Sequence, residues 1–154
     1  GARTCEAAAA LRKLGADPMQ VDDYLKDTYD ELTLKASCMS KAKRHDNAII
    51  TIPYKDGVLT RSLMSQVADQ MLEIQGIDAV FVIADDTEGE TAISARSNGK
   101  VNVQRIMEAI GGFGHMTAAA VQRKRCDIDE LEQELLEKTE EYFREVRNEG
   151  NSEE

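Results

Sequence analysis

The chain has 154 residues, of which 42% are hydrophobic, and its formal net charge at pH 7 is −10. This length is enough for one hydrophobic core, and the sequence has neither an apolar run near the roughly 18 to 20 residues of a membrane helix nor a charged and then apolar leader. Its cysteines are odd in number and far apart, at Cys5, Cys38 and Cys126. Their spacing predicts neither a disulfide framework nor a zinc site, and it favours the reducing cytosol.

The negative charge is concentrated at the C-terminal end of the chain. Residues 127–154 hold 12 acidic and three basic side chains, so the first 126 residues are almost neutral. We interpret this charge as the solvated face of a helix. It therefore does not exclude a phosphate-bearing ligand on the rest of the chain, which evenly spread negative charge would repel.

Three helices are predicted before the first strand, at residues 4–14, 17–26 and 28–43. The first is rich in alanine and ends at Gly15, and the second begins with Asp17 as N-cap and a proline in its first turn. The chain begins without methionine, in a segment typical of a loop entering a helix. We therefore expect a piece of a longer protein, with residues 1–45 as a helical linker.

From residue 48 onward, the pattern alternates between strands and helices. Strands are predicted at residues 48–53, 78–85, 90–97 and 119–126, and helices at residues 59–75, 103–110 and 129–149. The turn at Glu88 and Gly89 makes a hairpin of the second and third strands, so the sheet is mixed. The predicted fold class is α/β, with a mixed β-sheet covered by helices, the last strand near a sheet edge, and a long acidic C-terminal helix. Residues 46–149 are expected to form this domain, and residues 150–154 an acidic tail.

A glycine-rich segment, "AIGGFGHM", places three glycines within four positions directly before His115, one of only two histidines. Glycine lets a ligand approach peptide N–H groups that a Cβ would shield, so such a loop can hold a phosphate. A histidine at its end, with an ordinary pKa near about 6.5, can donate a proton to a phosphate oxygen. The motif alone is equally compatible with a flexible turn.

Arg96 is a second candidate for binding phosphate. Strand alternation places Ala92, Ser94 and Arg96 on one face of the sheet, so this arginine lies among small residues near the end of its strand, where α/β sheets gather ligands. Its planar guanidinium can bind phosphate with two hydrogen bonds. The alternative is an exposed arginine in a surface ion pair.

The segment "ISARSNGKVNVQRIMEAIGGFGHMTAAAVQ" resembles the DHH-associated C-terminal domain of the DHH phosphoesterase superfamily. That domain has a strand with an Arg-Ser pair, a short helix and a glycine-rich loop that ends in histidine. The parts "SARS", "VNVQRIMEAIGG" and "HMTAAAVQ" are most similar to the membrane-anchored cyclic-di-AMP phosphodiesterases of Gram-positive bacteria, and "GARTCEAAAALRKLGAD" is similar to their linker. Phe113 departs from the pattern, which usually has glycine there; its ring could stack on a nucleobase or narrow the loop.

The resemblance implies metal-dependent hydrolysis of a phosphodiester by two manganese ions, which an upstream DHH domain holds with aspartates and histidines. This chain has no Asp-His-His motif and only His45 and His115 as histidines. The resemblance thus implies the substrate-binding half of the enzyme, inactive alone and without a metal site. The substrate-binding residues that it implies are Arg96, Ser97, Gly112, Phe113, Gly114 and His115. No catalytic residue is expected, although an assisting role for His115 stays open.

The partners that the resemblance implies are a cyclic dinucleotide or a short linear dinucleotide, and the upstream DHH domain of the same chain. It also implies a cytoplasmic location on a parent protein tethered to the membrane, without direct membrane contact by this piece. A homodimer is an option. The basic segments at residues 41–44 and 121–126 lack interleaved aromatic residues, so we do not expect sequence-specific binding of nucleic acid.

Two alternatives stay open at this point. The first is the corresponding half of a cytosolic oligoribonuclease or pAp phosphatase, with the same fold and linear substrates. The second is a dimerisation or docking module that uses the terminal helices, in which the glycine-rich loop is purely structural. Equilibrium binding of cyclic and linear nucleotides distinguishes all three readings.

Overall fold

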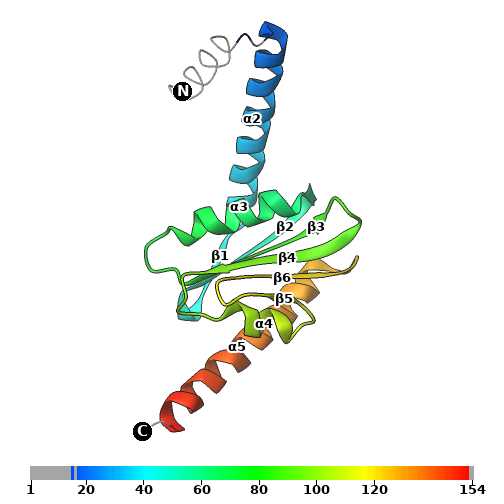
Figure 1. The fold of residues 1–154 in the computed structure, drawn as a ribbon. Coiled ribbons are helices and arrows are strands. Elements are labelled where there is room, and N and C mark those ends of the chain that lie inside the picture. Colours follow the sequence, from blue (N-terminus) through cyan, green and yellow to red (C-terminus); the bar gives the residue numbers. More distant parts are fainter. Residues whose placement is uncertain (1–14, 16, 153–154) are drawn as a thin grey trace. The chain divides into compact units, whose positions relative to one another are not determined.

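The computed structural model describes residues 15 and 17–152 (Figure 1), which form parts of two compact units, Gly1–Ser37 and Cys38–Glu154. Helix α2 spans Pro18–Met39 and is one helix where the sequence predicted two. No glycine or proline separates the two predicted segments, so the helix continues through them. The predicted helix at residues 4–14 lies outside the described residues. None of the helices built from the described residues has both the length and the apolarity needed to cross a bilayer.

The second unit is built on a six-stranded mixed sheet, which confirms the predicted fold class. Its strands are β1 (Lys43–His45), β2 (Ile49–Leu59), β3 (Ala79–Asp86), β4 (Glu90–Ser97), β5 (Phe113–Gly114) and β6 (Ala118–Lys124), in the spatial order β1-β2-β3-β4-β6-β5. Only β2 and β3 are parallel. The predicted position of β6 near an edge is confirmed, because only the two-residue β5 lies beyond it.

Strand β2 differs from its prediction, which ended it at Pro53. The strand continues to Leu59, and its pairing with β3 shifts in register between Tyr54 and Leu59. A proline removes one backbone donor, but Pro53 still pairs with Ile83, and the irregularity lies further along the strand. Strands β1 and β5 were not predicted, since two or three residues are too few to show a period.

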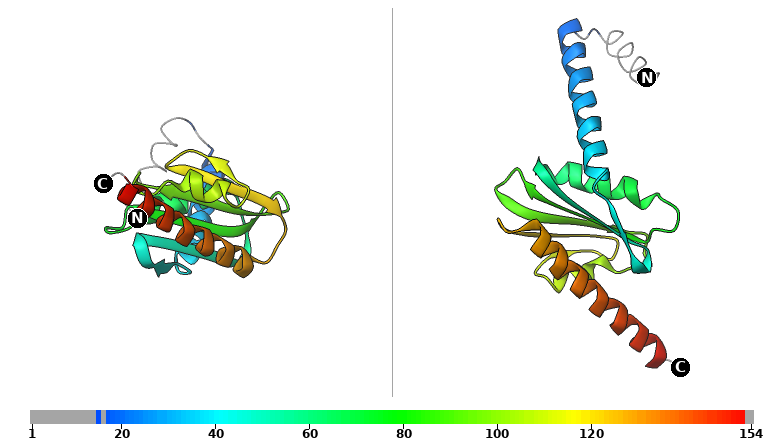
Figure 2. Two further views of the ribbon diagram at one scale, coloured as in Figure 1. Left: turned by 90° about the horizontal axis from the view of Figure 1, so that it is seen from below. Right: turned by 180° about the vertical axis from the view of Figure 1, so that it is seen from behind.

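Helices cover both faces of the sheet (Figures 1 and 2). Helix α3 (Arg61–Leu72) lies on one face, and α4 (Val103–Glu108) and α5 (Ile128–Ser152) lie on the other. The side chains of Thr60 and Asn102 accept hydrogen bonds from the first turns of α3 and α4, respectively. Helix α5 includes residues 150–152, which the sequence assigned to an acidic tail.

Alternation along the strands divides the core between the two faces. Phe81, Ile83 and Ile93 belong to the cluster that packs against α4 and α5. The residues between them, such as Val80 and Val82, point to the opposite face, where α3 packs on β3 and β4. In the described part of the chain, α3 makes no comparable contact with β5 or β6. The sheet is therefore uncovered beside α3 on this face.

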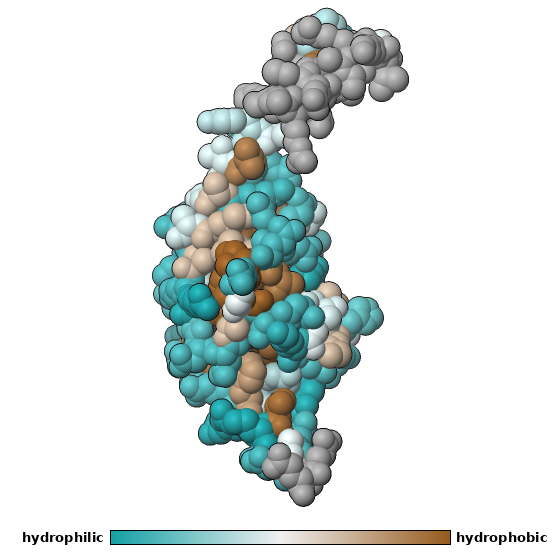
Figure 3. Space-filling model, turned by 90° about the vertical axis from the view of Figure 1, so that its left-hand side faces the viewer, coloured by the Kyte–Doolittle hydropathy of each residue, from teal (hydrophilic) through white to brown (hydrophobic). Residues whose placement is uncertain are grey.

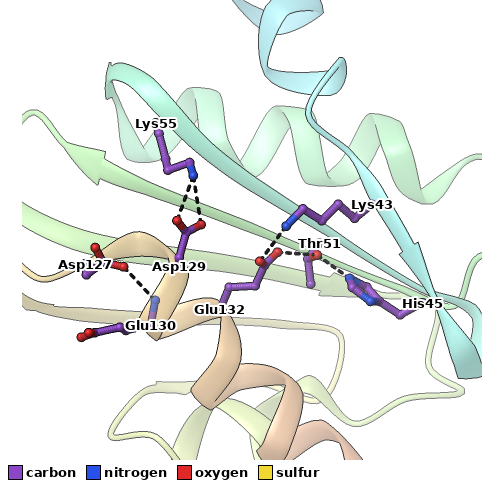
Figure 4. Close-up of polar contacts among 8 residues, drawn as sticks. All are labelled: Lys43, His45, Thr51, Lys55, Asp127, Asp129, Glu130 and Glu132. Carbon is purple, nitrogen blue, oxygen red and sulfur yellow. Dashed lines mark hydrogen bonds and ion pairs between the residues drawn. The ribbon is translucent and has the colours of Figure 1, made fainter.

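A buried polar network joins the first two strands to α5 (Figure 4). The Glu132 carboxylate, only 6% exposed, accepts hydrogen bonds from Thr51 Oγ1 and Lys43 Nζ, both at 2.9 Å. Thr51 has one hydroxyl hydrogen and gives it to Glu132, so the Nε2 atom of His45, 2.6 Å from Thr51 Oγ1, must be a donor. The buried charge is thus paired and fully hydrogen-bonded, as burial of a carboxylate requires.

Candidate functional site

An open cavity of about 370 Å³ lies where the sheet is uncovered beside α3. We call it the α3-side cavity. Its lining comes from three parts of the chain that are distant in sequence. They are the first turns of α3 with Arg61, Ser62 and Ser65, strand β4 with Ser94 and Arg96, and the β5–β6 hairpin with Phe113, Gly114, His115, Ala118, Ala119 and Ala120.

Small side chains form the floor of the α3-side cavity. Ser94 lies opposite Ala120, and Arg96 lies opposite Ala118, in the antiparallel register of β4 and β6. Because these side chains are small, they project little from the backbone of the sheet. A flat ligand can therefore approach the strands closely. The floor therefore suits a planar group such as a nucleobase.

Arg96 is held in place at the wall of this cavity. Its side chain is 23% exposed, its Nε lies 3.4 Å from the Asp69 carboxylate on α3, and its Nη1 donates to the Ala95 carbonyl at 2.8 Å. Asp69 itself is 63% exposed, so the ion pair is weakened by solvent. The guanidinium is oriented in advance of ligand binding while its charge stays only partly compensated.

Arg61 is a second cation of this site, and the sequence analysis did not identify it. Its Nε is buried without a hydrogen-bond partner, and its guanidinium forms no ion pair within the described residues. Two arginines and one histidine thus line the cavity, and none of the eleven lining residues is acidic. The cavity therefore has a positive potential, although the chain as a whole is acidic.

The glycine-rich segment contains a short edge strand, which the sequence did not predict, and several of its peptide amides already donate within the chain. Phe113 and Gly114 pair with Ala120 and Ala119 as β5. The peptide N–H groups of Gly111, Gly112 and His115 donate to carbonyl groups of this chain, at 3.1, 2.7 and 2.7 Å. These three amides are therefore not free to bind an anion.

The glycines serve close packing instead. A Cβ at position 112 would clash with the Ala120 carbonyl, and one at position 114 would clash with the Ala119 backbone. Gly114 also has φ +147°, a conformation that other residues rarely adopt. Glycine at these positions lets β5 lie against β6, which places Phe113 and His115 at the cavity.

Four of the six residues implied by the resemblance line the α3-side cavity, namely Arg96, Phe113, Gly114 and His115. Ser97 does not, because strand alternation turns its side chain to the other face, where its Oγ donates to the Val101 carbonyl at 2.6 Å. Gly112 lies behind β5 and packs on the backbone of β6. Ser97 and Gly112 therefore shape the site without lining it.

Apolar side chains surround the histidine. Phe113 is 60% and Met116 is 49% exposed, so the segment around His115 presents apolar surface next to the two arginines. On the face that Figure 3 shows, hydrophobic surface forms a patch among hydrophilic residues. Apolar surface beside cations fits a ligand that carries both a base and a phosphate.

A larger cavity, about 730 Å³, lies on the opposite face between η1 (Asp46–Ala48) and α5. Its charged lining residues are of both signs, Arg44 and His45 together with Asp46, Glu137 and Glu140. It contains none of the residues that the sequence analysis proposed for ligand binding. Its mixed charge does not favour a phosphate, so we place the candidate site in the α3-side cavity.

The described residues do not fit a manganese centre. Among the side chains that the structure describes, no three histidine, cysteine, aspartate or glutamate residues come together in a way that could hold a metal ion. The cavity itself offers one imidazole and no carboxylate. Two divalent ions need several carboxylate or imidazole ligands, which the lining of this cavity does not offer.

Comparison with known proteins identifies relatives of this chain. A family model described as the DHHA1 domain matches residues 45–145. The chain is 37% identical over 145 residues to the cyclic-di-AMP phosphodiesterase PdeA of Listeria monocytogenes, and 38% identical over 146 residues to the cyclic-di-AMP phosphodiesterase GdpP of Bacillus subtilis. These matches cover 94% and 93% of the chain but only 22% of each relative. The chain thus corresponds to about a fifth of their length.

Solved structures share the fold at lower identity. The pGpG-specific phosphodiesterase PggH from Vibrio cholerae matches with a TM-score of 0.55 and 14% identity over 79% of this chain and 43% of that one. An exopolyphosphatase-related protein from Bacteroides fragilis matches with a TM-score of 0.54 and 22% identity, over 84% of this chain and 41% of that one.

Proposed function

This chain belongs to the DHHA1 domain family, and on that premise we propose that it forms the substrate-binding part of a cyclic-di-AMP phosphodiesterase. In this proposal, hydrolysis by manganese ions takes place on a part of the protein beyond these residues. The observation that carries the proposal is the α3-side cavity, which combines partly uncompensated positive charge, an exposed aromatic ring and a floor of small residues. The cavity faces the cytoplasm, in a parent protein tethered to the membrane.

Each part of a nucleotide has a matching surface in this site. Arg96 and His115 bind a phosphate, for which a guanidinium fork and an imidazole N–H are suitable donors. The exposed ring of Phe113 stacks on an adenine, and Ser94, Ala118 and the rest of the floor leave room for the second nucleoside. Each charge-assisted phosphate contact contributes about 1.5 to 3 kcal/mol.

The proposal is tested by isothermal titration of this chain with cyclic-di-AMP and with its linear counterpart pApA. Cyclic-di-AMP should bind saturably and more tightly than pApA. Tighter binding of pApA would favour the oligoribonuclease or pAp phosphatase alternative. Absence of binding of either ligand at millimolar concentration would favour the interaction module. With Mn²⁺ added, cyclic-di-AMP should stay intact, and hydrolysis by this chain alone would contradict the placement of the metal centre.

Phe113→Ala tests the stacking role. Loss of one base–aromatic stack costs about 1 to 3 kcal/mol, so the Kd for cyclic-di-AMP should rise about 5- to 150-fold. Tyr29→Ala is a matched control, since Tyr29 is a 68% exposed aromatic residue outside the cavity, and this variant should bind like the unchanged chain. Equal affinities for the Phe113→Ala variant and the unchanged chain would show that the ring does not contact the base.

A further inference from the structure

Arg61 differs from Arg96, the other arginine that lines the α3-side cavity. Arg96 has Asp69 as a partner 3.4 Å away, whereas Arg61 has no ion pair within the described residues and its buried Nε has no hydrogen-bond partner. Asp86 has the only other buried side-chain atom without a partner in the described residues, its Oδ2, and it forms no ion pair with Arg61. The Nε atom itself is enclosed by protein, so a ligand in the cavity meets the rest of the Arg61 side chain, whose charge no carboxylate of the described residues pairs with.

The two arginines enter the α3-side cavity from different walls. Arg96 comes from β4, near the end of the sheet that carries His115, and Arg61 comes from the first turn of α3 together with Ser62 and Ser65. Ser62 and Ser65 add hydroxyl donors beside Arg61. The cavity therefore has two separate sets of phosphate donors above one floor.

We infer that Arg61 binds a second phosphate of the ligand, which makes Arg61 the residue that selects dinucleotides with two phosphates over those with one. The inference rests on the proposed function of the same cavity. A cyclic dinucleotide carries two phosphodiesters, one for Arg96 and His115 and one for Arg61 with the serines of α3. A dinucleoside monophosphate such as ApA occupies the first set alone.

The test compares titrations of this chain and of Arg61→Gln with cyclic-di-AMP, which has two phosphates, and with ApA, which has one. The variant should bind cyclic-di-AMP about tenfold or more weakly, while its Kd for ApA stays within about twofold of that of the unchanged chain. Arg61→Lys, which keeps the charge but not the planar fork, should recover part of the loss. Arg96→Gln should lower the affinity for both ligands.

Arg144→Gln is the matched control, because it removes one charge from an exposed position on α5, away from the cavity. It should leave both affinities unchanged, which separates a direct contact from the effect of net charge. An equal loss for cyclic-di-AMP and ApA in Arg61→Gln, or no loss for either, would overturn the inference. A melting temperature that falls with unchanged affinities would show a structural role and overturn it as well.

Failure of the inference and failure of the proposed function give different results. If the unchanged chain binds cyclic-di-AMP and Arg61→Gln binds it equally well, only the role of Arg61 is wrong. If the unchanged chain binds neither ligand, the proposed function fails and the inference fails with it.

Discussion

The Arg96→Gln variant should bind cyclic-di-AMP about 10- to 150-fold more weakly than the unchanged chain. Glutamine keeps the length of the aliphatic stem but removes the charged fork, and a hydrogen bond to a charged group is worth about 1.5 to 3 kcal/mol. The fold should tolerate the change, since the Asp69 partner is 63% exposed and an ion pair of this kind contributes little to stability. Isothermal titration measures the affinity, and thermal unfolding checks the fold.

Asp69→Asn provides the control for this prediction. It removes the carboxylate that lies 3.4 Å from Arg96 Nε, and with it the charge that competes with a phosphate. Cyclic-di-AMP should therefore bind this variant as tightly as the unchanged chain, or more tightly. Equal affinity of Arg96→Gln and the unchanged chain would show that the phosphate lies elsewhere.

The second large effect is expected at Gly112, and it concerns stability. A Cβ there would clash with the Ala120 carbonyl and lie 2.7 Å from a Val121 methyl group and 2.9 Å from the Met107 carbonyl. Two of these three neighbours are backbone atoms, one in β6 and one in α4, so relief of the clash requires a shift of the strand or of the helix. Gly112→Val should therefore lower the free energy of unfolding by about 3 kcal/mol or more, as measured by urea denaturation.

Gly150→Val is the comparison for this prediction, because no atom lies within 4 Å of the Cβ that it would add on α5. Its free energy of unfolding should stay within about 1 kcal/mol of that of the unchanged chain, since only helix propensity changes. If Gly112→Val is as stable as Gly150→Val, the close approach of β5 to β6 is not a requirement of the fold.

The sequence predicted those parts of the fold whose pattern extends over many residues. Strands β3 and β4 have eight residues each, a clear hydrophobic pattern and a turn between them, so their hairpin could be recognised. Strands β1 and β5 could not, because their pairing depends on partners that are distant in sequence. The single helix α2 was predicted as two because its apolar residues are loosely spaced. Only helix propensity indicates that the helix continues through this segment.

The candidate site was predictable only where a motif marks it. Arg96 and His115 belong to a recognisable segment, whereas Arg61 precedes Arg96 by 35 positions and reaches the same cavity only because α3 packs across β4. Strand alternation predicted that the side chains of Ser97 and Arg96 point to different faces of the sheet, which agrees with the structure. Only the motif suggested Ser97 as a binding residue. Hydrogen bonds of the glycine amides could not be inferred, since they depend on the pairing of β5.

Alternation along β4 and β6 also affects how this protein can diversify. Neighbouring positions have different roles, since Ser94 and Arg96 line the α3-side cavity while Ile93 and Ala95 belong to the hydrophobic core. Substitutions at Ser94 and Arg96 should change the cavity without disturbing the core. A mutant library restricted to these two positions and to Ala118 and Ala120 should therefore yield mostly folded members. Changes on one side of these two strands therefore alter the lining of the cavity and leave the packed side of the sheet intact.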